Sequence, residues 1–215
     1  MTKVYPEAVN QPHFTQLIQK FLYEQQHPGD ETDPAHRIYP PFYEQLMVYP
    51  SALATFYALS DLSGICGMKC KRIRAVETWR KGPGRYDTVF VVTDPTISAG
   101  MAGLNVAQVR LFFSFSVDGI RYPCALIHWF TRVSDGPDET TGMWIIQPDD
   151  VVYGAPTAVV IHLDTVLHAA HLLPVFGKDS VSKRLKHKQT LDTFTSFMST
   201  SMRIITPLQL PSNNL

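Results

Sequence analysis

Hydrophobic residues recur with two different periods along this chain, and each period predicts a kind of secondary structure. Between residues 13 and 27 the spacing is three to four residues, which predicts an amphipathic helix. From residue 86 onward the spacing is two residues, which predicts a series of strands. These strands cover 86–94, 105–117, 120–133, 143–148 and 157–167. The Asp118–Gly119 pair is a hairpin turn signal between two of them.

The other stretches carry weaker signals. The segment SALATFYALSD is predicted to form a short helix with Ser51 as its N-cap. The glycine-rich, basic stretch 64–86 is predicted to be irregular, and 183–199 to form a last helix. The final residues, 206–215, are predicted to be disordered.

Several strands at short spacing, joined by tight turns, predict an α+β fold built on an antiparallel β-barrel or curved sheet. No internal repeat or low-complexity tract interrupts the chain. The expected parts are a helical N-terminal flank (1–63), the β-barrel core (64–177), and a basic helix with a disordered tail (178–215).

The composition supports a folded chain and excludes some classes of protein. With 45% hydrophobic and 18% charged residues, there is enough apolar material for a core and too little charge for a disordered protein. No apolar run approaches the roughly 18 residues of a membrane span, and the N-terminus has no signal-peptide pattern. We therefore expect no membrane partner, and a location in the nucleus or the cytoplasm. Cys66, Cys70 and Cys124 are expected to be free thiols.

Positive charge is concentrated in two segments, although the whole chain is neutral with 19 basic and 19 acidic residues. Segment 69–85 holds seven basic residues and one acidic residue, and segment 178–188 holds five and one. Two basic patches on an otherwise acidic chain indicate an anionic partner such as DNA or chromatin, although solvated loops are an equally good explanation. An aromatic ring among cations, as at Trp79, suits nucleic acid through stacking and phosphate contacts. The candidate residues are Lys69, Lys71, Arg72, Arg74, Trp79, Arg80, Lys81, Arg85, Lys183, Arg184, Lys186 and Lys188.

Four possible metal ligands lie close together in the segment VVIHLDTVLHAAHLLPVFG, residues 159–177. On a strand, His162 and Asp164 would share a face, which is half of a 2-His-1-carboxylate site. His128 or His171 would supply the missing histidine. Surface or hydrogen-bonded histidines are the favoured interpretation, because no further ligand spacing is present. We therefore expect no cofactor.

Aromatic residues flank the acidic loop 134–142. Aromatic rings beside acids at the mouth of a small barrel are typical of pockets that bind a peptide or a methylated lysine. Core packing is the more common fate of such residues. The pocket candidates are Tyr86, Trp129, Phe130 and Trp144.

Three long sequence segments resemble one protein family. RYDTVFVVTDP, then GMAGLNVAQVRLFFSFSVDGIRYPCALIHWFTRVSDGPDETTGMWIIQP, then VVIHLDTVLHAAHLLPVFG resemble the C-terminal region of Plavaka-type transposases, mobile elements of mushroom-forming fungi. The resemblance covers roughly residues 45–178. It implies engagement of DNA or chromatin. In such elements the nuclease lies upstream of this region, and nothing in this chain looks like it.

A second, weaker similarity is to bromo-adjacent homology (BAH) domains. It rests on the order of strands around HWF, the acidic loop and IHLDTVLHAAHLLPV. BAH domains are small β-barrels that bind nucleosomes or partner proteins, and this likeness makes 159–177 a strand, a tight connection and another strand. A similar fold does not fix the function.

These observations favour a non-catalytic binding module for DNA or chromatin, derived from a transposase. The nucleophile elbow G-x-S-x-G and the Walker loop are absent from the sequence. Two alternatives stay open at this point. One is a metal-dependent enzyme that uses the His-x-Asp motif and a further histidine, and the other is a protein–protein interaction domain.

Overall fold

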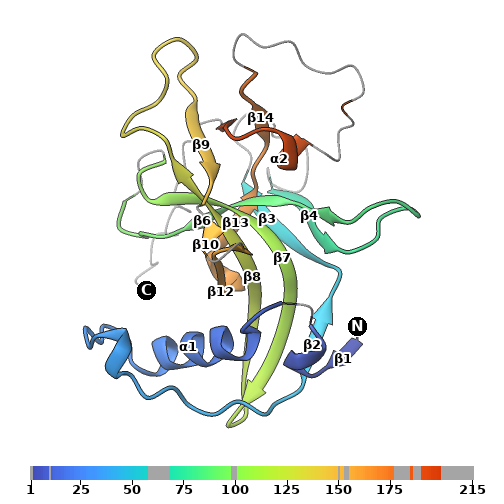
Figure 1. Cartoon of the computed structure of the whole chain (residues 1–215), viewed down its shortest axis with the longest axis vertical. Coiled ribbons are helices and arrows are strands. Elements are labelled where there is room, and N and C mark those ends of the chain that lie inside the picture. The colour runs from blue at the N-terminus through green and yellow to red at the C-terminus, as the bar shows by residue number, and fades with distance from the viewer. Residues whose placement is uncertain are drawn as a thin grey trace, which may run out of the picture.

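The computed structural model describes residues 2–9, 11–57, 68–97, 101–149, 151–152, 155–176, 185 and 190–199. Within these ranges the chain is mostly antiparallel β-sheet, curled into a half-barrel, with one long helix beside it (Figure 1). The α-helices are α1 (Phe14–Gln26) and α2 (Thr190–Thr193), and short 3-10 turns are η1 (Pro6–Ala8), η2 (Pro34–His36) and η4 (Leu163–Thr165). The strands are β1 (Thr2–Val4), β2 (Leu46–Tyr49), β3 (Ser51–Tyr57), β4 (Met68–Val76), β5 (Arg85–Tyr86), β6 (Thr88–Val92), β7 (Leu104–Val117), β8 (Ile120–Arg132), β9 (Trp144–Pro148), β10 (Val151–Val152), β11 (Ala155–Pro156), β12 (Ala158–His162), β13 (Val166–Ala169), β14 (Leu172–Pro174) and β15 (Phe197–Ser199).

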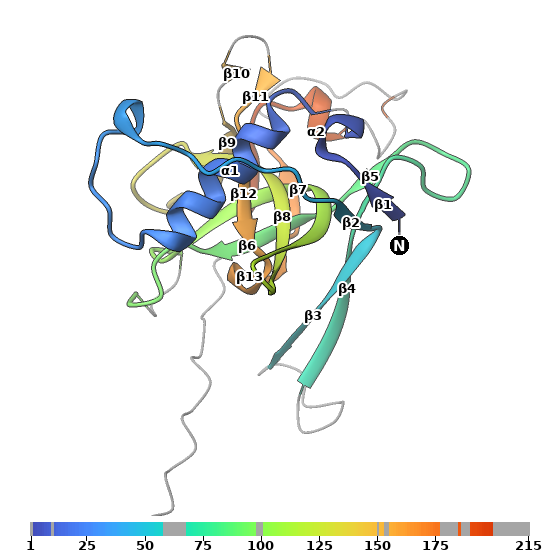
Figure 2. The same cartoon turned by 90° about the horizontal axis from the view of Figure 1, so that it is seen from below.

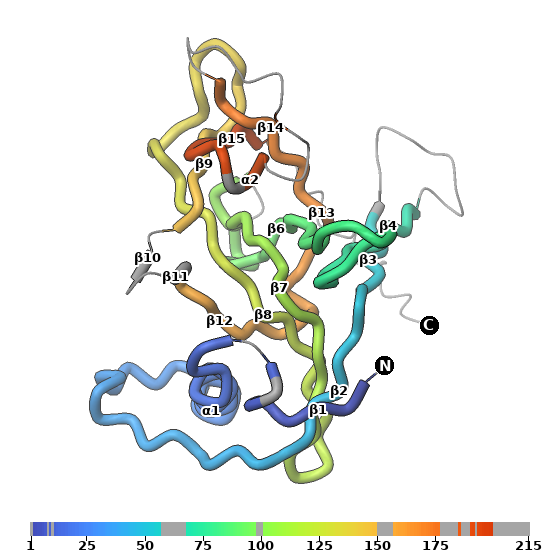
Figure 3. The backbone as a smooth tube through the Cα atoms, turned by 45° about the vertical axis from the view of Figure 1, so that its right-hand side comes forward, coloured from blue at the N-terminus to red at the C-terminus, as the bar shows by residue number. Residues whose placement is uncertain are grey.

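The long strands β7 and β8 form the centre of the main sheet, and each is shared by several partners. β6 pairs with the first half of β7, and β2 pairs with its second half. β12 pairs with the middle of β8, and β9 with its end. A sheet that changes partners along its central strands curls, as the tube drawing shows (Figure 3).

The hairpin between β7 and β8 confirms the prediction made from its turn residues. Asp118 and Gly119 have φ values of 52° and 78°, so both adopt the left-handed conformation that a two-residue hairpin turn requires. Val117 then lies opposite Ile120.

Helix α1 confirms the predicted amphipathic helix and covers one face of the sheet. Its buried residues are Phe14, Ile18, Phe21 and Leu22. The ring of Phe14 meets that of Phe113 on β7 edge to face, with centroids 5.2 Å apart. The apolar face of α1 is thus stabilised by aromatic side chains of β7.

Two predictions for the N-terminal half are wrong. The segment that begins at Ser51 is strand β3 rather than a helix, and the stretch 64–86 contains strands β4 and β5 rather than irregular chain. The reason is cross-strand pairing, because β3 finds a partner of equal period in β4, with Leu53 opposite Arg72. Their alternating side chains then bury Ala54 and Ile73 against the body.

The predicted last helix is also corrected. Only Thr190–Thr193 is helical among the described residues of 183–199, and Phe197–Ser199 is strand β15. β15 lies between β9 and β14, and these neighbours bury Phe197 completely. Strands from 1–63 and from 178–215 therefore share one sheet with 64–177. The predicted disorder of 206–215 lies outside the described residues.

A search of the described residues for a long apolar helix finds none that could cross a bilayer.

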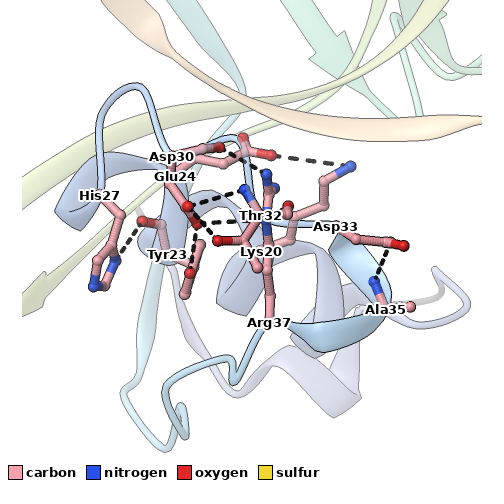
Figure 4. A network of polar contacts seen from close by, with 9 residues as sticks. All are labelled: Lys20, Tyr23, Glu24, His27, Asp30, Thr32, Asp33, Ala35 and Arg37. Carbon is pink, nitrogen blue, oxygen red and sulfur yellow. Dashed lines mark hydrogen bonds and ion pairs between the residues drawn. The ribbon is translucent and has the colours of Figure 1, made fainter.

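The segment after α1 is held by a polar network around Asp30 (Figure 4). The hydroxyl of Tyr23 donates a hydrogen bond of 2.7 Å to one carboxylate oxygen of Asp30. The backbone N–H and the hydroxyl of Thr32 donate to the other oxygen, at 3.0 and 2.5 Å. Arg37 adds a hydrogen bond to the Asp30 carbonyl oxygen. These donors, first of all the Thr32 hydroxyl, lower the pKa of Asp30 to about 2.

This network predicts an acid-sensitive contribution to stability. Because the pKa of Asp30 is lowered on folding, the ionised carboxylate stabilises the fold fully above its ordinary pKa near 3.8, and this contribution is lost as the pH falls toward 2. Asp30→Asn should lower Tm at pH 7, and the gap to the wild type should narrow between pH 4 and pH 2. Thermal unfolding followed by circular dichroism measures this, with Glu31→Gln as an exposed control. A gap that stays constant down to pH 2 would contradict the prediction.

Candidate nucleic-acid interface

Strands β3 and β4 form a two-stranded ribbon that extends from the body (Figure 2). Side chains of β4 alternate between its two faces. Ile73 and Ala75 are buried on the inner face, whereas Cys70 and Arg72 are exposed on the outer face. The ribbon thus presents a basic outer surface on an apolar base.

A tight turn follows β4 and places two cations at its tip. The N–H of Gly82 donates a 2.9 Å hydrogen bond to the carbonyl of Trp79, which closes the turn. Arg80 and Lys81 occupy its two central positions, with φ values of 50° and 61°. Both are in the left-handed region that non-glycine residues rarely adopt, so the turn fixes where their side chains leave the backbone.

Trp79 is the centre of a cluster of guanidinium groups. The guanidinium carbon atoms of Arg74, Arg80 and Arg85 lie 4.6, 5.4 and 5.6 Å from the ring centroid. At these distances the electron-rich ring face attracts each cation. Arg74 from β4, Arg80 from the turn and Arg85 from β5 thereby place three positive charges around one aromatic ring.

Asp87 fixes the base of this cluster. Its carboxylate accepts a 2.7 Å hydrogen bond from Nε of Arg85 and a 2.9 Å hydrogen bond from the backbone N–H of Arg74. Within the described ranges neither Arg74 nor Arg80 forms an ion pair with a carboxylate. The charges of these two arginines thus stay available to an anionic partner.

The remaining predicted basic residues are distributed over other surfaces. Lys69 and Lys71 point toward the inner face of the ribbon, and Lys71 Nζ lies 2.5 Å from Nε2 of His171. Arg72 donates a hydrogen bond to the hydroxyl of Ser51 on the neighbouring strand. The second predicted basic set, Lys183, Arg184, Lys186 and Lys188, lies outside the described residues.

The four aromatic residues of the predicted peptide pocket do not meet. Trp129 and Phe130 are consecutive on β8, so their side chains point to opposite faces. Trp129 and Tyr86 pack against one hydrophobic cluster, whereas Phe130 and Trp144 pack against another. Tyr86 is covered by the guanidinium of Arg110 at 4.0 Å, and Trp144 by that of Arg132 at 5.0 Å. Phe130 is buried and the other three rings are half-buried, and of these four only Trp129 and Phe130 line a common groove, of about 540 Å³.

The structure keeps His162 and Asp164 together but, among the described residues, does not bring a further histidine to them. His162 Nδ1 and an oxygen of Asp164 are 3.4 Å apart, and His162 caps the η4 turn. His171 instead contacts Lys71. His128 lies opposite Ala158, four positions along β12 from His162, which is about 13 Å at the rise of a strand. No group of three metal-binding side chains forms in the part of the chain that the structure describes.

Buried titratable groups of the body stay in their neutral forms. Burial, assisted by the positive charge of Arg110, lowers the pKa of His128 to about 4. Burial lowers the pKa of His168 and raises that of the Cys124 thiol. Because a neutral thiol is a poor nucleophile, Cys124 is not a candidate for nucleophilic chemistry. It is buried on β8 and contributes to the core.

Arg110 lines a groove and is a candidate binding residue that the sequence pattern did not indicate. A groove of about 660 Å³ lies between the β4–β5 hairpin, β2 and β7, and Arg110, Tyr49 and Tyr86 line it. Arg110 occupies a register shift between Val109 and Leu111 in the pairing of β7 with β8. A charge within the apolar run V-R-L was the one signal for this bulge.

Comparison with protein-family models, with curated proteins and with solved structures finds no match for this chain.

Proposed function

We propose that this chain is a non-catalytic module that binds duplex DNA through the β3–β4 ribbon and the Trp79–Gly82 turn. The observation that carries the proposal is the clustering of three guanidinium groups, from β4, the turn and β5, around the ring of Trp79. Arginine and lysine bind nucleic acid mainly by replacing counterions at its phosphates. A turn with fixed cations at its tip loses little conformational entropy when it meets such a backbone.

The shape of the ribbon supports a duplex as the partner. The major groove of DNA admits a two-stranded ribbon, and the basic residues Arg72 and Arg74 lie on β4 of this one. The similarity of residues 45–178 to Plavaka-type transposases supports DNA rather than an acidic protein. The same proposal has four further parts: a BAH-like interpretation of the curved sheet, an origin in a fungal mobile element, attachment to chromatin and a location in the nucleus.

The proposal predicts a change in the salt dependence of binding. Each phosphate contact contributes about 0.9 to the slope of log K against log salt. Arg80→Ala should therefore flatten the slope by about one contact and weaken binding roughly tenfold near 0.1 M salt. Fluorescence anisotropy of a labelled duplex between about 50 and 200 mM salt measures both quantities. Lys20→Ala, which removes a charge from the exposed side of α1, is the matched control and should change neither.

Thiol footprinting locates the contact independently. Cys70 is exposed on the outer face of the ribbon, and Cys124 is buried in the body. In a Cys66→Ser background, saturating duplex should slow maleimide labelling of Cys70. Equal labelling with and without DNA, or equal salt slopes for Arg80→Ala and Lys20→Ala, would refute the proposed surface.

A further inference from the structure

A second surface with features of a binding site lies at the other end of the sheet, on the face opposite helix α1. Phe113 and Phe115 of β7 point toward α1, so Ser114 between them points away from it. Lys3 pairs with Met47 on β2, and Met47 pairs with Ser114. Lys3, Met47 and Ser114 thus form one row across β1, β2 and β7, which lie side by side near the β7–β8 turn (Figure 3).

This open face contains a groove of about 700 Å³ lined by three tyrosines. Tyr43 enters it from the segment before β2 and is 83% exposed, and Tyr5 follows β1 and is 53% exposed. The amide of Gln45 donates a 3.0 Å hydrogen bond to the hydroxyl of Tyr5. Tyr49 is half-buried on β2. Exposed rings next to strands β1 and β2 can stack with a flat partner, and little further conformational entropy is lost because the fold already orders their backbone.

The same groove carries positioned positive charge. Arg121 donates hydrogen bonds from Nη2 to the hydroxyl of Tyr49, at 2.7 Å, and to that of Ser114, at 3.3 Å. Lys3 adds a second cation to the lining, and Glu44 is the one acid among the described lining residues. Hydrogen bonds from a single nitrogen leave the other donors of the Arg121 guanidinium for a ligand.

We propose that this face binds an unpaired stretch of nucleic acid. Tyrosine faces stack on bases, and cations beside them contact the phosphates that connect those bases. In a duplex the faces of the bases are covered by stacking on the neighbouring base pairs, so stacking on Tyr5 and Tyr43 requires an unpaired strand whose bases have left the stack. The site shares no residue with the Trp79 cluster, and so this inference goes beyond duplex binding and does not depend on it.

The test uses the full chain and two labelled probes, a fifteen-nucleotide oligo-dT and an oligo-rU of the same length. Tyr43→Ala should weaken binding of oligo-dT roughly tenfold, because a stacked base contributes about 1–3 kcal/mol. Tyr43→Phe keeps the ring and should bind like the wild type. Ile38→Ala removes a side chain that is 89% exposed and lies outside the groove, and it should also bind like the wild type. A preference between oligo-dT and oligo-rU identifies DNA or RNA as the source of the strand.

Repeating the measurement in an Arg74→Glu, Arg80→Glu background separates this site from the duplex interface. Oligo-dT binding that persists there and still depends on Tyr43 would support the proposal, even if duplex binding proves absent. Equal oligo-dT affinity for Tyr43→Ala and the wild type would overturn it. A second result would also overturn it: no binding of either oligonucleotide, together with binding of a proline-rich peptide that depends on Tyr43. In that case a protein partner would occupy the groove.

Discussion

The double variant Arg74→Glu, Arg80→Glu is expected to bind duplex DNA at least about a hundredfold more weakly than the wild type near 0.1 M salt. At that salt concentration a slope of 0.9 per contact means that each phosphate contact raises the affinity roughly tenfold. The variant removes two such contacts. Charge reversal also replaces attraction by repulsion. The carboxylate introduced by Arg74→Glu would further lie beside Arg85, which already contacts the Trp79 ring, and would neutralise part of the remaining charge.

Anisotropy titrations of a labelled duplex at several salt concentrations measure this loss. The matched control is Gln16→Glu, Lys20→Glu, Gln25→Glu, which lowers the net charge equally on exposed positions of α1. The control should lose far less affinity, because only its long-range repulsion acts on the DNA. Equal losses in the two variants would mean that net charge, rather than the Trp79 cluster, governs binding. Arg80→Glu alone serves if the double variant does not fold.

Phe113→Ala is expected to lower the free energy of unfolding by about 3–5 kcal/mol. Phe113 is 2% exposed at the contact between β7 and helix α1. Its ring lies 5.2 Å from that of Phe14 and 6.1 Å from that of Phe115. Truncation removes buried apolar surface and leaves a cavity that the rigid strand cannot close.

Urea unfolding followed by circular dichroism measures the change. Phe113→Leu should cost much less than Phe113→Ala, because most of the volume is kept, and it preserves the test if the alanine variant does not fold. Ile38→Ala, at a position that is 89% exposed, should cost under about 1 kcal/mol. A loss at Phe113→Ala no larger than that of the exposed control would show that α1 does not depend on β7 for its packing.

The two proposed surfaces divide the molecule by chemistry. The Trp79 turn concentrates guanidinium charge, which suits a phosphate backbone of any sequence. The groove beside Arg121 combines exposed rings with fewer charges, which suits bases that have left the duplex. A protein with both surfaces could hold a duplex next to an opened strand.

Local residue patterns were enough to predict part of this fold. Helix α1, the long strands β7 and β8 and the turn at Asp118–Gly119 each follow from periodicity or from turn chemistry within a few residues. The concentration of arginine around Trp79 was also visible in the sequence, because those residues are close neighbours in the chain.

Pairing between strands determined the rest of the fold. The alanine-rich segment at Ser51 is compatible with a helix, and only its partner β4 makes it a strand. Phe197–Ser199 is a strand because β9 and β14 leave room between them. Ladder register keeps His128 and His162 apart, although the spacing of His162 and Asp164 alone suggested a metal site.

Helix α1, the central hairpin and the concentration of basic residues around Trp79 could be predicted from the sequence alone, because each depends on residues that are close together in the chain. The groove lined by Lys3, Tyr43 and Arg121 could not, since these residues come from three distant segments that meet through the order β1–β2–β7–β8. Folding in three dimensions also brings the backbone N–H of Arg74 to the carboxylate of Asp87, and it distributes the predicted pocket aromatics over two hydrophobic clusters. The physical reason is that strand pairing and burial depend on partners far along the chain, which no local pattern specifies.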